Sequence, residues 1–265
     1  MTDESLQQNV EEIVREAAAL MTRDFTVKSK GTIANQVTSN DVAVENFLKE
    51  SLSRILPDSG FIAEESEHNG IDTEYTWIID PIDGTSNYVR DLASSGISVG
   101  LYKNMQPFIG VVYNPYRNEL FSARKGAGAY CNGKPIHVSD RDFAHSCFCT
   151  SLSCYRKERA HACAQIMENV FVQCDDFRRF GAAVIEMTAL AAGRVELYFE
   201  MGLAPWDHAA SRVIVEEAGG FVANVYGDEI SYTGQTSVIA ANTRENLEKL
   251  RSMILEVAPV RPADD

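Results

Sequence analysis

The chain has 265 residues and a formal net charge of −14 at pH 7. This length suffices for one large domain or two modest ones around a buried core. The acidic balance argues against a protein that binds nucleic acid directly, because such a protein has clustered lysines and arginines. No apolar run approaches the ~20 residues that a membrane helix needs. The first residues are acidic where a signal peptide would be basic, so we expect a cytoplasmic protein with reduced cysteines.

The chain begins with a predicted amphipathic helix. Apolar side chains recur at helical spacing from Leu6 to Met21, and Ser5 and Gln8 have the spacing of a capping box. After this helix, Lys28 opens a polar stretch that we interpret as a loop. We therefore expect the first helix to be structural.

A second helix is predicted between Val44 and Leu56, because its apolar residues recur at helical spacing and Pro57 marks an end. Thr38 and Asp41 precede it with the spacing of a capping box. On these grounds alone, Asp41 is a carboxylate at the start of a helix.

Two adjacent glutamates, Glu64 and Glu65, follow a short apolar strand that begins at Phe61. Neighbouring carboxylates on a surface are usually only solvated. Here they stand at a strand end, a few residues before a second acidic segment, and this position favours a shared metal site.

The second acidic segment is Trp77–Asn87. Tyr75–Ile79 is predicted to form a buried strand that ends at Asp80, because Pro81 cannot donate a hydrogen bond to a sheet. Asp83 follows after one tight turn, so the carboxylates of Asp80 and Asp83 can face the same hard cation.

Gly84 and Thr85 complete this turn. Glycine lets backbone amides approach an anion, so the turn can hold a phosphate while a cation neutralises the phosphate's other face. Ordinary turn chemistry also uses Asp-Pro and Asp-Gly, and the segment alone leaves both interpretations open.

Three further strands are predicted at residues 97–102, 108–113 and 120–123, and Asn132-Gly133 is a strong hairpin signal. We expect these strands to form one sheet rich in antiparallel pairs. A polar break near residues 138–144 suggests two parts, residues 1–140 with an α+β organisation and residues 141–265 with an α/β organisation.

The second half alternates between strands and helices, which is typical of a layered α/β unit. The predicted strands are 147–151, 177–180, 195–199, 221–225 and 238–241, and the predicted helices are 156–168, 182–192, 207–218 and 244–257. Glu200 ends one of these strands, and Asp207 stands where a helix begins, so its structural role would be an N-cap.

Several of these segments together resemble the inositol monophosphatase family of metal-dependent sugar phosphatases. The resemblance is carried by Trp77–Asn87 with its preceding strand, by the Ala63-Glu64-Glu65-Ser66 segment, and by the Trp206-Asp207-His208-Ala209-Ala210 segment. It covers nearly the whole chain. It implies one compact catalytic unit with a layered α-β-α-β-α sandwich and a site between residues 1–140 and 141–265.

The resemblance also implies a role for individual residues. The implied metal ligands are Glu64, Asp80, the carbonyl of Ile82, Asp83 and Asp207, the implied catalytic residues are Thr85, Asp41 and Glu65, and the implied substrate-binding residues are Gly84, Thr85, Ala183, Glu200 and Asp207. The chain departs from the family where Asn35-Gln36 replaces the usual Asp-Leu, and where Ala182 lacks a hydroxyl in the segment that lines the sugar pocket. The second departure bears on the identity of the substrate.

We therefore expect a phosphatase with two or three Mg²⁺ ions that hydrolyses a small phosphate monoester, with myo-inositol monophosphate as the first candidate. Fructose 1,6-bisphosphate, histidinol phosphate and a 3′-phosphonucleotide stay open as substrates of the same chemistry. From another class, the chain could be a regulatory partner of the transcription machinery. Lithium sensitivity and a homodimer are expected by family analogy only.

Overall fold

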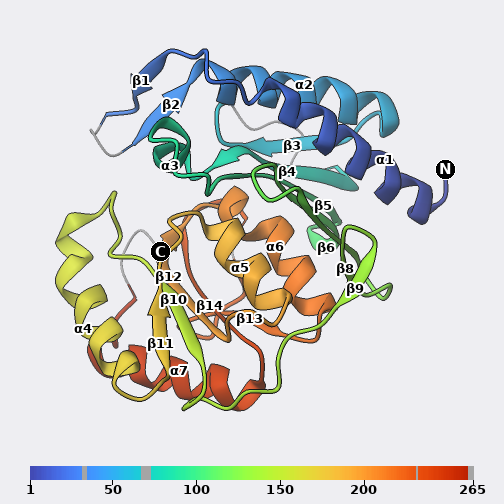
Figure 1. Ribbon diagram of the computed structural model, residues 1–265. Helices are drawn as coiled ribbons and strands as arrows, with labels where there is room; N and C mark the ends of the chain where they lie inside the picture. The colour runs from blue at the N-terminus through green and yellow to red at the C-terminus, as the bar shows by residue number, and fades with distance from the viewer. Residues whose placement is uncertain (32–34, 67–72, 231, 262–265) are drawn as a thin grey trace.

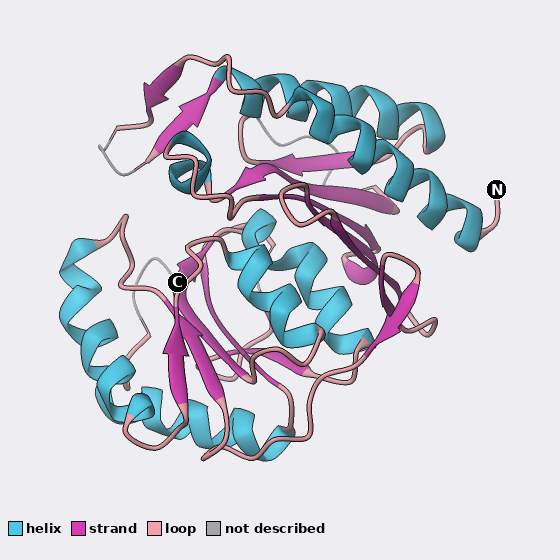
Figure 2. Ribbon diagram, viewed as in Figure 1, coloured by secondary structure: helices cyan, strands magenta, loops and turns pink. Residues whose placement is uncertain are grey.

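The computed structural model describes residues 1–261 except 32–34, 67–72 and 231. Within these residues the chain forms five layers, in the order helices, sheet, helices, sheet, helices (Figures 1 and 2). The expected α-β-α-β-α sandwich is confirmed. The division of the chain near residue 140 stays a prediction.

The first sheet has seven strands in the spatial order β3-β4-β5-β6-β7-β8-β9. Their bounds are β3 Gly60–Ala63, β4 Tyr75–Asp83, β5 Gly96–Lys103, β6 Gln106–Asn114, β7 Glu119–Arg124, β8 Ala129–Cys131 and β9 Lys134–Ile136. Every pair is antiparallel except β3 with β4, which confirms the prediction of a sheet rich in antiparallel pairs. Helices α1 (Asp3–Ala17) and α2 (Ser39–Ile55) cover one face of this sheet with an apolar core that includes the fully buried Trp77.

The second sheet has five strands in the order β11-β10-β12-β14-β13. Their bounds are β10 Cys147–Thr150, β11 Asp176–Arg178, β12 Leu197–Leu203, β13 Phe221–Asn224 and β14 Thr236–Ala241. Helices α4 (Ala160–Phe171) and α7 (Arg244–Val257) pack on its outer face, and a short 3-10 helix, η2 (Lys157–Arg159), leads into α4. All the elements predicted for the second half are present, with small differences in their bounds.

Helices α5 (Ala183–Ala191) and α6 (Pro205–Glu217) lie between the two sheets and share one apolar core with residues of both. Helix α6 approaches the first sheet closely because glycines face it. A Cβ atom on Gly110 would lie 2.2 Å from the carbonyl oxygen of Ala210, and one on Gly100 would lie 3.2 Å from the backbone nitrogen of Ala210. These glycines let the backbone of α6 rest on strands β5 and β6.

Four local predictions are corrected. Helix α1 is capped by Thr2 with Ser5, three residues before the predicted capping box, because Thr2 accepts the hydrogen bond from the Ser5 amide. Strand β4 continues past Pro81 to Asp83, since the register with β5 shifts there and the proline needs no ladder hydrogen bond.

The two other corrections concern short elements. The expected polar loop after Lys28 contains a hairpin of β1 (Val27–Ser29) and β2 (Gln36–Thr38), and the turn after Gly84 continues into helix α3 (Thr85–Val89). Both elements are too short to give a periodic apolar pattern.

The six cysteines are free thiols, as expected, and Cys154 is exposed. No described helix has both the length and the hydropathy that a membrane crossing requires.

Candidate functional site

Three carboxylates from distant parts of the chain meet at the boundary between the first sheet and helix α6. One oxygen of each of Asp80, Asp83 and Asp207 lies within 4.8 Å of the other two. The register shift in β4 brings the first two together, because Asp80 pairs with Ser98 and Asp83 pairs with Gly96, so two residues of β4 oppose one of β5. The sequence predicted that these three residues share a site, and the structure brings them together.

Backbone amides hold two of these carboxylates in place. Asp83 accepts a hydrogen bond from the Val184 N–H at 2.7 Å, where α5 begins, and Asp207 accepts one from the Ala204 N–H at 2.8 Å. Ala204 is the N-cap of α6 and Asp207 is the third helical residue, so the N-cap interpretation of Asp207 is wrong by three positions. The carboxylate still caps the helix and also faces the cluster.

Electrostatics show that this cluster suits a cation. Burial, reinforced by the negative charges of Glu64 and Asp83, raises the pKa of Asp80 well above its ordinary value. Burial likewise raises the pKa of Asp83 to about 7. Converging carboxylate oxygens are the donors that Mg²⁺ prefers, and a bound cation would remove the repulsion that these pKa values report. The residues present therefore fit a divalent metal.

Glu64 and Glu65 lie beside the cluster and share a basic partner that the sequence did not reveal. Lys30 donates to Glu64 at 3.1 Å and to Glu65 at 2.6 Å. Glu64 lines the same cavity as the three aspartates, while the amide of Glu65 donates to Glu45. Burial raises the pKa of Glu65 to about 7, against the hydrogen bond from Lys30. Lys30 could be found only from the structure, because it stands in a stretch interpreted as a loop.

Asp41 and Thr85 form the pair that the family resemblance implied. The Thr85 hydroxyl lies 3.3 Å from a carboxylate oxygen of Asp41 and 3.2 Å from the carbonyl oxygen of Ile82. Asp41 is fully buried and also accepts hydrogen bonds from the amide and hydroxyl of Thr38, which confirms the predicted capping box of α2. Burial raises the pKa of Asp41, against these hydrogen bonds. The helix cap thus also fixes the carboxylate toward Thr85.

The cluster opens into two adjoining cavities. A cavity of about 150 Å³ contains the three aspartates with Glu64, Ile82 and Thr85. A larger one of about 450 Å³ shares Gly84 with it and extends to Ala183 and Glu200. Gly84 has φ +79°, and a Cβ there would lie 2.9 Å from the Cβ of Ala182, so only glycine fits. Of the predicted substrate-binding residues, Gly84, Ala183, Glu200 and Asp207 line this second cavity, and Thr85 lines the first.

Two buried acids in the wall of the second cavity have hydrogen-bond partners of their own. Glu200 accepts hydrogen bonds from the hydroxyls of Ser151 and Tyr198, the latter at 3.1 Å. Glu186, which the sequence did not single out, accepts the amides of Phe180 at 2.6 Å and Gly181 at 3.0 Å. Burial raises the pKa of Glu186 to about 8. Glu186 therefore fixes the segment that precedes Ala183.

His208 follows Asp207 in sequence but faces away from the site. Its side chain is fully buried against Tyr232, with ring centroids 5.8 Å apart. Neither ring nitrogen has a hydrogen-bond partner among the described residues, and burial lowers the pKa of His208 to about 3. The structure therefore places the ring in the buried interior and not beside the metal ligands.

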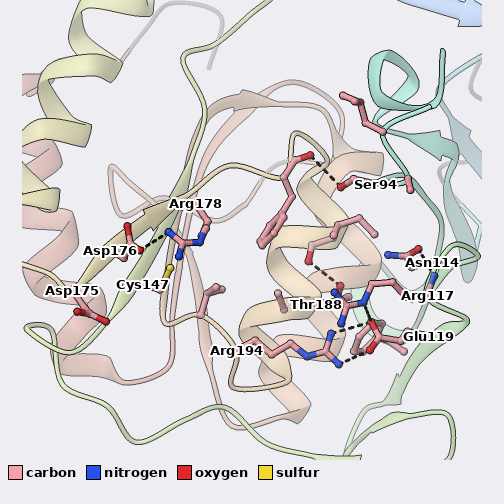
Figure 3. A pocket seen from close by; sticks show the side chains of 17 residues that line it. Ser94, Asn114, Arg117, Glu119, Cys147, Asp175, Asp176, Arg178, Thr188 and Arg194 are labelled. Carbon is pink, nitrogen blue, oxygen red and sulfur yellow. Dashed lines mark hydrogen bonds and ion pairs between the residues drawn. The ribbon is translucent and has the colours of Figure 1, made fainter. Parts of the chain in front are cut away.

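A cavity of about 520 Å³ lies elsewhere, beside helix α5, and no predicted site residue lines it (Figure 3). Its arginines are paired with acids. Both terminal nitrogens of Arg194 donate hydrogen bonds to the Glu119 carboxylate, at 2.6 and 2.9 Å. A guanidinium nitrogen of Arg178 lies 2.5 Å from a carboxylate oxygen of Asp176.

The five-layer sandwich with a carboxylate cluster between its parts is the fold of a class of metal-dependent phosphatases. The sequence model of the inositol monophosphatase family matches residues 1–257, and the chain belongs to this family. The family is Mg²⁺-dependent.

Individual relatives agree with this assignment. The chain is 38% identical over 210 residues, 78% of each chain, to a Salmonella typhimurium protein named Nus factor SuhB. Among solved structures, it resembles the inositol monophosphatase of Anabaena (TM-score 0.84, 30% identity, 97% of this chain and 98% of that one). It also resembles the Thermotoga maritima IMPase TM1415 (TM-score 0.82, 28% identity, 94% and 96%).

Proposed function

We propose that this protein is a Mg²⁺-dependent phosphatase that hydrolyses a small phosphate monoester, with myo-inositol monophosphate as the leading substrate. The observation that carries the proposal is the convergence of three carboxylate oxygens within 4.8 Å in the wall of a cavity. Monoester hydrolysis is among the slowest uncatalysed reactions in water, and metal clamping of the phosphate is a general solution to it. Family membership supports the same chemistry.

In this proposal the chain holds two or three ions through oxygen donors. The assigned ligands are Glu64, Asp80, the carbonyl of Ile82, Asp83 and Asp207. Bound Mg²⁺ supplies charge neutralisation of the phosphate and lowers the pKa of a water molecule.

Thr85, Asp41 and Glu65 then act on the attacking water. The Thr85 hydroxyl lies within hydrogen-bond distance of Asp41 and of the Ile82 carbonyl oxygen, and its lone pairs would orient the water. Burial raises the pKa of Asp41 above its ordinary value and raises the pKa of Glu65 to about 7, so Glu65 can take up a proton near neutral pH.

The substrate would lie in the 450 Å³ cavity, a volume typical of small-molecule sites. The backbone amides of Gly84 and Thr85 would hold phosphate oxygens, and Ala183, Glu200 and Asp207 would face the hydroxyls of the polyol. Glu200→Gln is expected to change the preference among polyol phosphates more than the turnover of an aryl phosphate. Equal losses on both substrates would count against this role.

The test of the whole proposal is phosphate release from a panel of inositol, sugar and nucleotide monophosphates, with Mg²⁺ and with a chelator. Chelator-sensitive release that favours myo-inositol monophosphate supports both the chemistry and the substrate. A preference for fructose 1,6-bisphosphate, histidinol phosphate or a 3′-phosphonucleotide would keep the chemistry and replace the substrate. Folded protein that releases no phosphate from any ester would contradict it.

A second candidate function is regulation of the transcription machinery by binding a protein partner. It is favoured by the relatives that carry the name Nus factor SuhB. Co-purification of transcription proteins with both the unchanged chain and Asp83→Asn would support a role independent of catalysis. Binding by neither protein would oppose it.

A cytoplasmic location, which rests on the sequence, and a homodimer and inhibition by lithium, which rest on family analogy, complete the proposal. Cell fractionation tests the first and light scattering of the purified protein tests the second. Phosphate release at increasing LiCl, with KCl as the control, tests the third.

A further inference from the structure

A turn at residues 153–156, between β10 and η2, lies where the two cavities of the site adjoin. The amide of Arg156 donates to the carbonyl oxygen of Ser153 at 2.9 Å across this turn. Its two central residues, Cys154 and Tyr155, each line both the 150 Å³ cavity and the 450 Å³ cavity. Figure 1 shows this segment rising from the second sheet toward α3. The turn is therefore a wall that the metal cluster and the substrate cavity share.

Buried groups hold this turn in place. Ser153 has φ +53°, in the left-handed region, and its amide donates to the Ser151 hydroxyl at 3.2 Å. The same hydroxyl donates to Glu200, one of the proposed substrate-binding acids. Both serines are buried. The position of Tyr155 is thus connected, through two buried residues, to the acid that would face the substrate's hydroxyls.

The side chain of Tyr155 has an aromatic face without a partner. It is 57% exposed, and within the described part of the chain it forms no hydrogen bond and no contact with another ring or a cation. By contrast, Tyr75, Tyr113 and Tyr232 each have a lysine or an arginine over the ring. The face of Tyr155 is therefore available to a ligand in the cavities that it lines.

The hydroxyl end of Tyr155 lies toward the metal cluster. Burial raises the pKa of Tyr155 above its ordinary value, with the Cys154 thiol as the next cause. The carboxylates of Asp207, Glu64 and Asp83 are close enough to raise this pKa further. The phenol is therefore uncharged at neutral pH, and a neutral ring offers its face to an apolar surface and its hydroxyl to a polar one.

The lining of the 450 Å³ cavity suits the different parts of a ring-shaped ligand. Glu200 and Asp207 can accept hydrogen bonds from hydroxyls, whereas Ala182 and Ala183 are small and apolar. A cyclic polyol has the matching division, because most of its hydroxyls point outward around the edge of the ring and its two faces expose C–H groups. An open-chain polyol has no such face to set against Tyr155.

We propose that Tyr155 is a specificity-determining residue that packs its ring on the C–H face of a cyclic polyol, so that monophosphates of ring alcohols are preferred over those of open-chain alcohols. This inference rests on the proposed function and narrows its substrate class. Tyrosine suits the role because its planar ring supplies a large contact area and loses little conformational freedom on binding.

The test compares two esters of secondary alcohols, myo-inositol 1-phosphate with a ring and glycerol 2-phosphate without one, in the presence of Mg²⁺. Tyr155→Ala should raise KM for the ring ester about tenfold, with kcat and the KM of glycerol 2-phosphate changed by less than about twofold. Tyr155→Phe keeps the ring and should retain the preference. Equal changes on the two esters, or no change on the ring ester, would overturn the proposal.

Two further variants separate the ring from the turn that carries it. Leu152→Ala is the matched control, because Leu152 is 41% exposed in the same segment and lines neither cavity. It should leave both KM values unchanged, and the same loss as in Tyr155→Ala would assign the effect to the turn and overturn the role of the ring. Tyr155→Leu keeps apolar bulk without a flat face, so full retention of the preference would also contradict the proposal.

Phenyl phosphate separates the ring contact from the hydroxyl contacts. It has a flat face and no hydroxyl, so Tyr155→Ala should raise its KM, whereas Glu200→Gln should leave it unchanged. An unchanged KM for phenyl phosphate in Tyr155→Ala would mean that Tyr155 binds no ring face, and would overturn the proposal.

The two proposals can fail separately. Hydrolysis of both esters with an equal response to Tyr155→Ala would remove the ring contact and keep the phosphatase. If no ester is hydrolysed, the proposed function fails, and calorimetric binding of myo-inositol 1-phosphate with Mg²⁺ decides the ring contact. Weaker binding by Tyr155→Ala would support the contact, and equal or absent binding in both proteins would overturn it.

Discussion

The acids of the site fall into two groups that differ in how close their carboxylates lie to one another. Asp80, Asp83 and Asp207 converge until their oxygens lie within 4.8 Å of one another. Glu186 and Glu200 each accept two hydrogen bonds from the chain and stand apart in the cavity wall. The first group needs a cation to offset its mutual repulsion, whereas the second group shapes the cavity wall through its hydrogen bonds to the chain.

The largest effect is expected from a substitution in the first group, the three converging aspartates. Asp83→Asn removes one converging charge and should lower Mg²⁺-dependent phosphate release by at least about a hundredfold, because cation-assisted steps depend on every ligand. The measurement is kcat/KM on the best ester of the panel. Asp175→Asn, at an exposed position outside the cluster, is the control and should be unaffected. Near-normal turnover by Asp83→Asn would remove the metal assignment.

The same group predicts an unusual dependence of stability on pH. Burial raises the pKa of Asp83 to about 7, against ~3.9 in an unfolded chain, so between these values the folded state holds a proton that the unfolded state has released. Without metal, this carboxyl lowers the free energy of unfolding by up to about 1.4 kcal/mol per unit as pH rises from 4 to 7. Added Mg²⁺ should reduce this decrease in the free energy of unfolding.

The measurement is chemical unfolding of the chelated protein and of Asp83→Asn across this range. The difference between the two curves reports Asp83 together with its effect on Asp80 and Asp207, whose pKa values its charge raises. The buried His208, whose pKa burial lowers to about 3, destabilises both proteins toward acid and cancels in the difference. Parallel curves for the two proteins would contradict the prediction.

A moderate effect is expected from a substitution of Lys30. Its ammonium group already serves as a cation for Glu64 and Glu65, so it competes with an external one. Lys30→Met should lower the Mg²⁺ concentration for half-maximal activity by about threefold to tenfold, a change of about one ion pair. Lys28→Met, on the exposed strand β1, is the control. A higher Mg²⁺ requirement would show that Lys30 supports the site instead.

The smallest effect is expected from a substitution in the second group, at Glu186. Because burial raises the pKa of Glu186 to about 8, its carboxyl is mostly protonated at pH 7, and glutamine resembles that form. Glu186→Gln should change turnover at pH 7 by less than about threefold, whereas Glu186→Ala should lower it more by freeing the Phe180–Gly181 segment. Equal turnover by the two variants would mean that the two amide hydrogen bonds do not position this wall.

Local signals in the sequence predicted most strands and helices and the proximity of Asp80 and Asp83, whereas the family resemblance implied the five layers and the convergence of Asp207 with these two aspartates. Strands of the first sheet alternate or run apolar between clear turns, and Asp80 and Asp83 stand in a segment long enough to resemble a family. The capping box of Thr38 and Asp41 was also legible, and it fixes the carboxylate that faces Thr85.

The residues that escaped prediction act through contacts distant in sequence. Lys30 meets Glu64 across 34 positions, and nothing around Lys30 marks it as part of a site. Glu186 lies inside an apolar helix whose pattern hides a single acid, and its partners are backbone amides of a loop. Strand β4 was predicted too short because Pro81 is a reliable strand terminator only where no bulge accommodates it.

The close contact between helix α6 and glycines 100 and 110 carries a lesson for transplanting this site into another scaffold. The depth at which the helix backbone sits sets how far the Asp207 carboxylate reaches toward β4, so the spacing of the three oxygens depends on side chains that are absent. A scaffold that copied every acid but placed alanine at position 110 would lift the helix from the sheet. Copying the three acids is therefore insufficient unless the glycines that let them approach one another, Gly100 and Gly110, are copied as well.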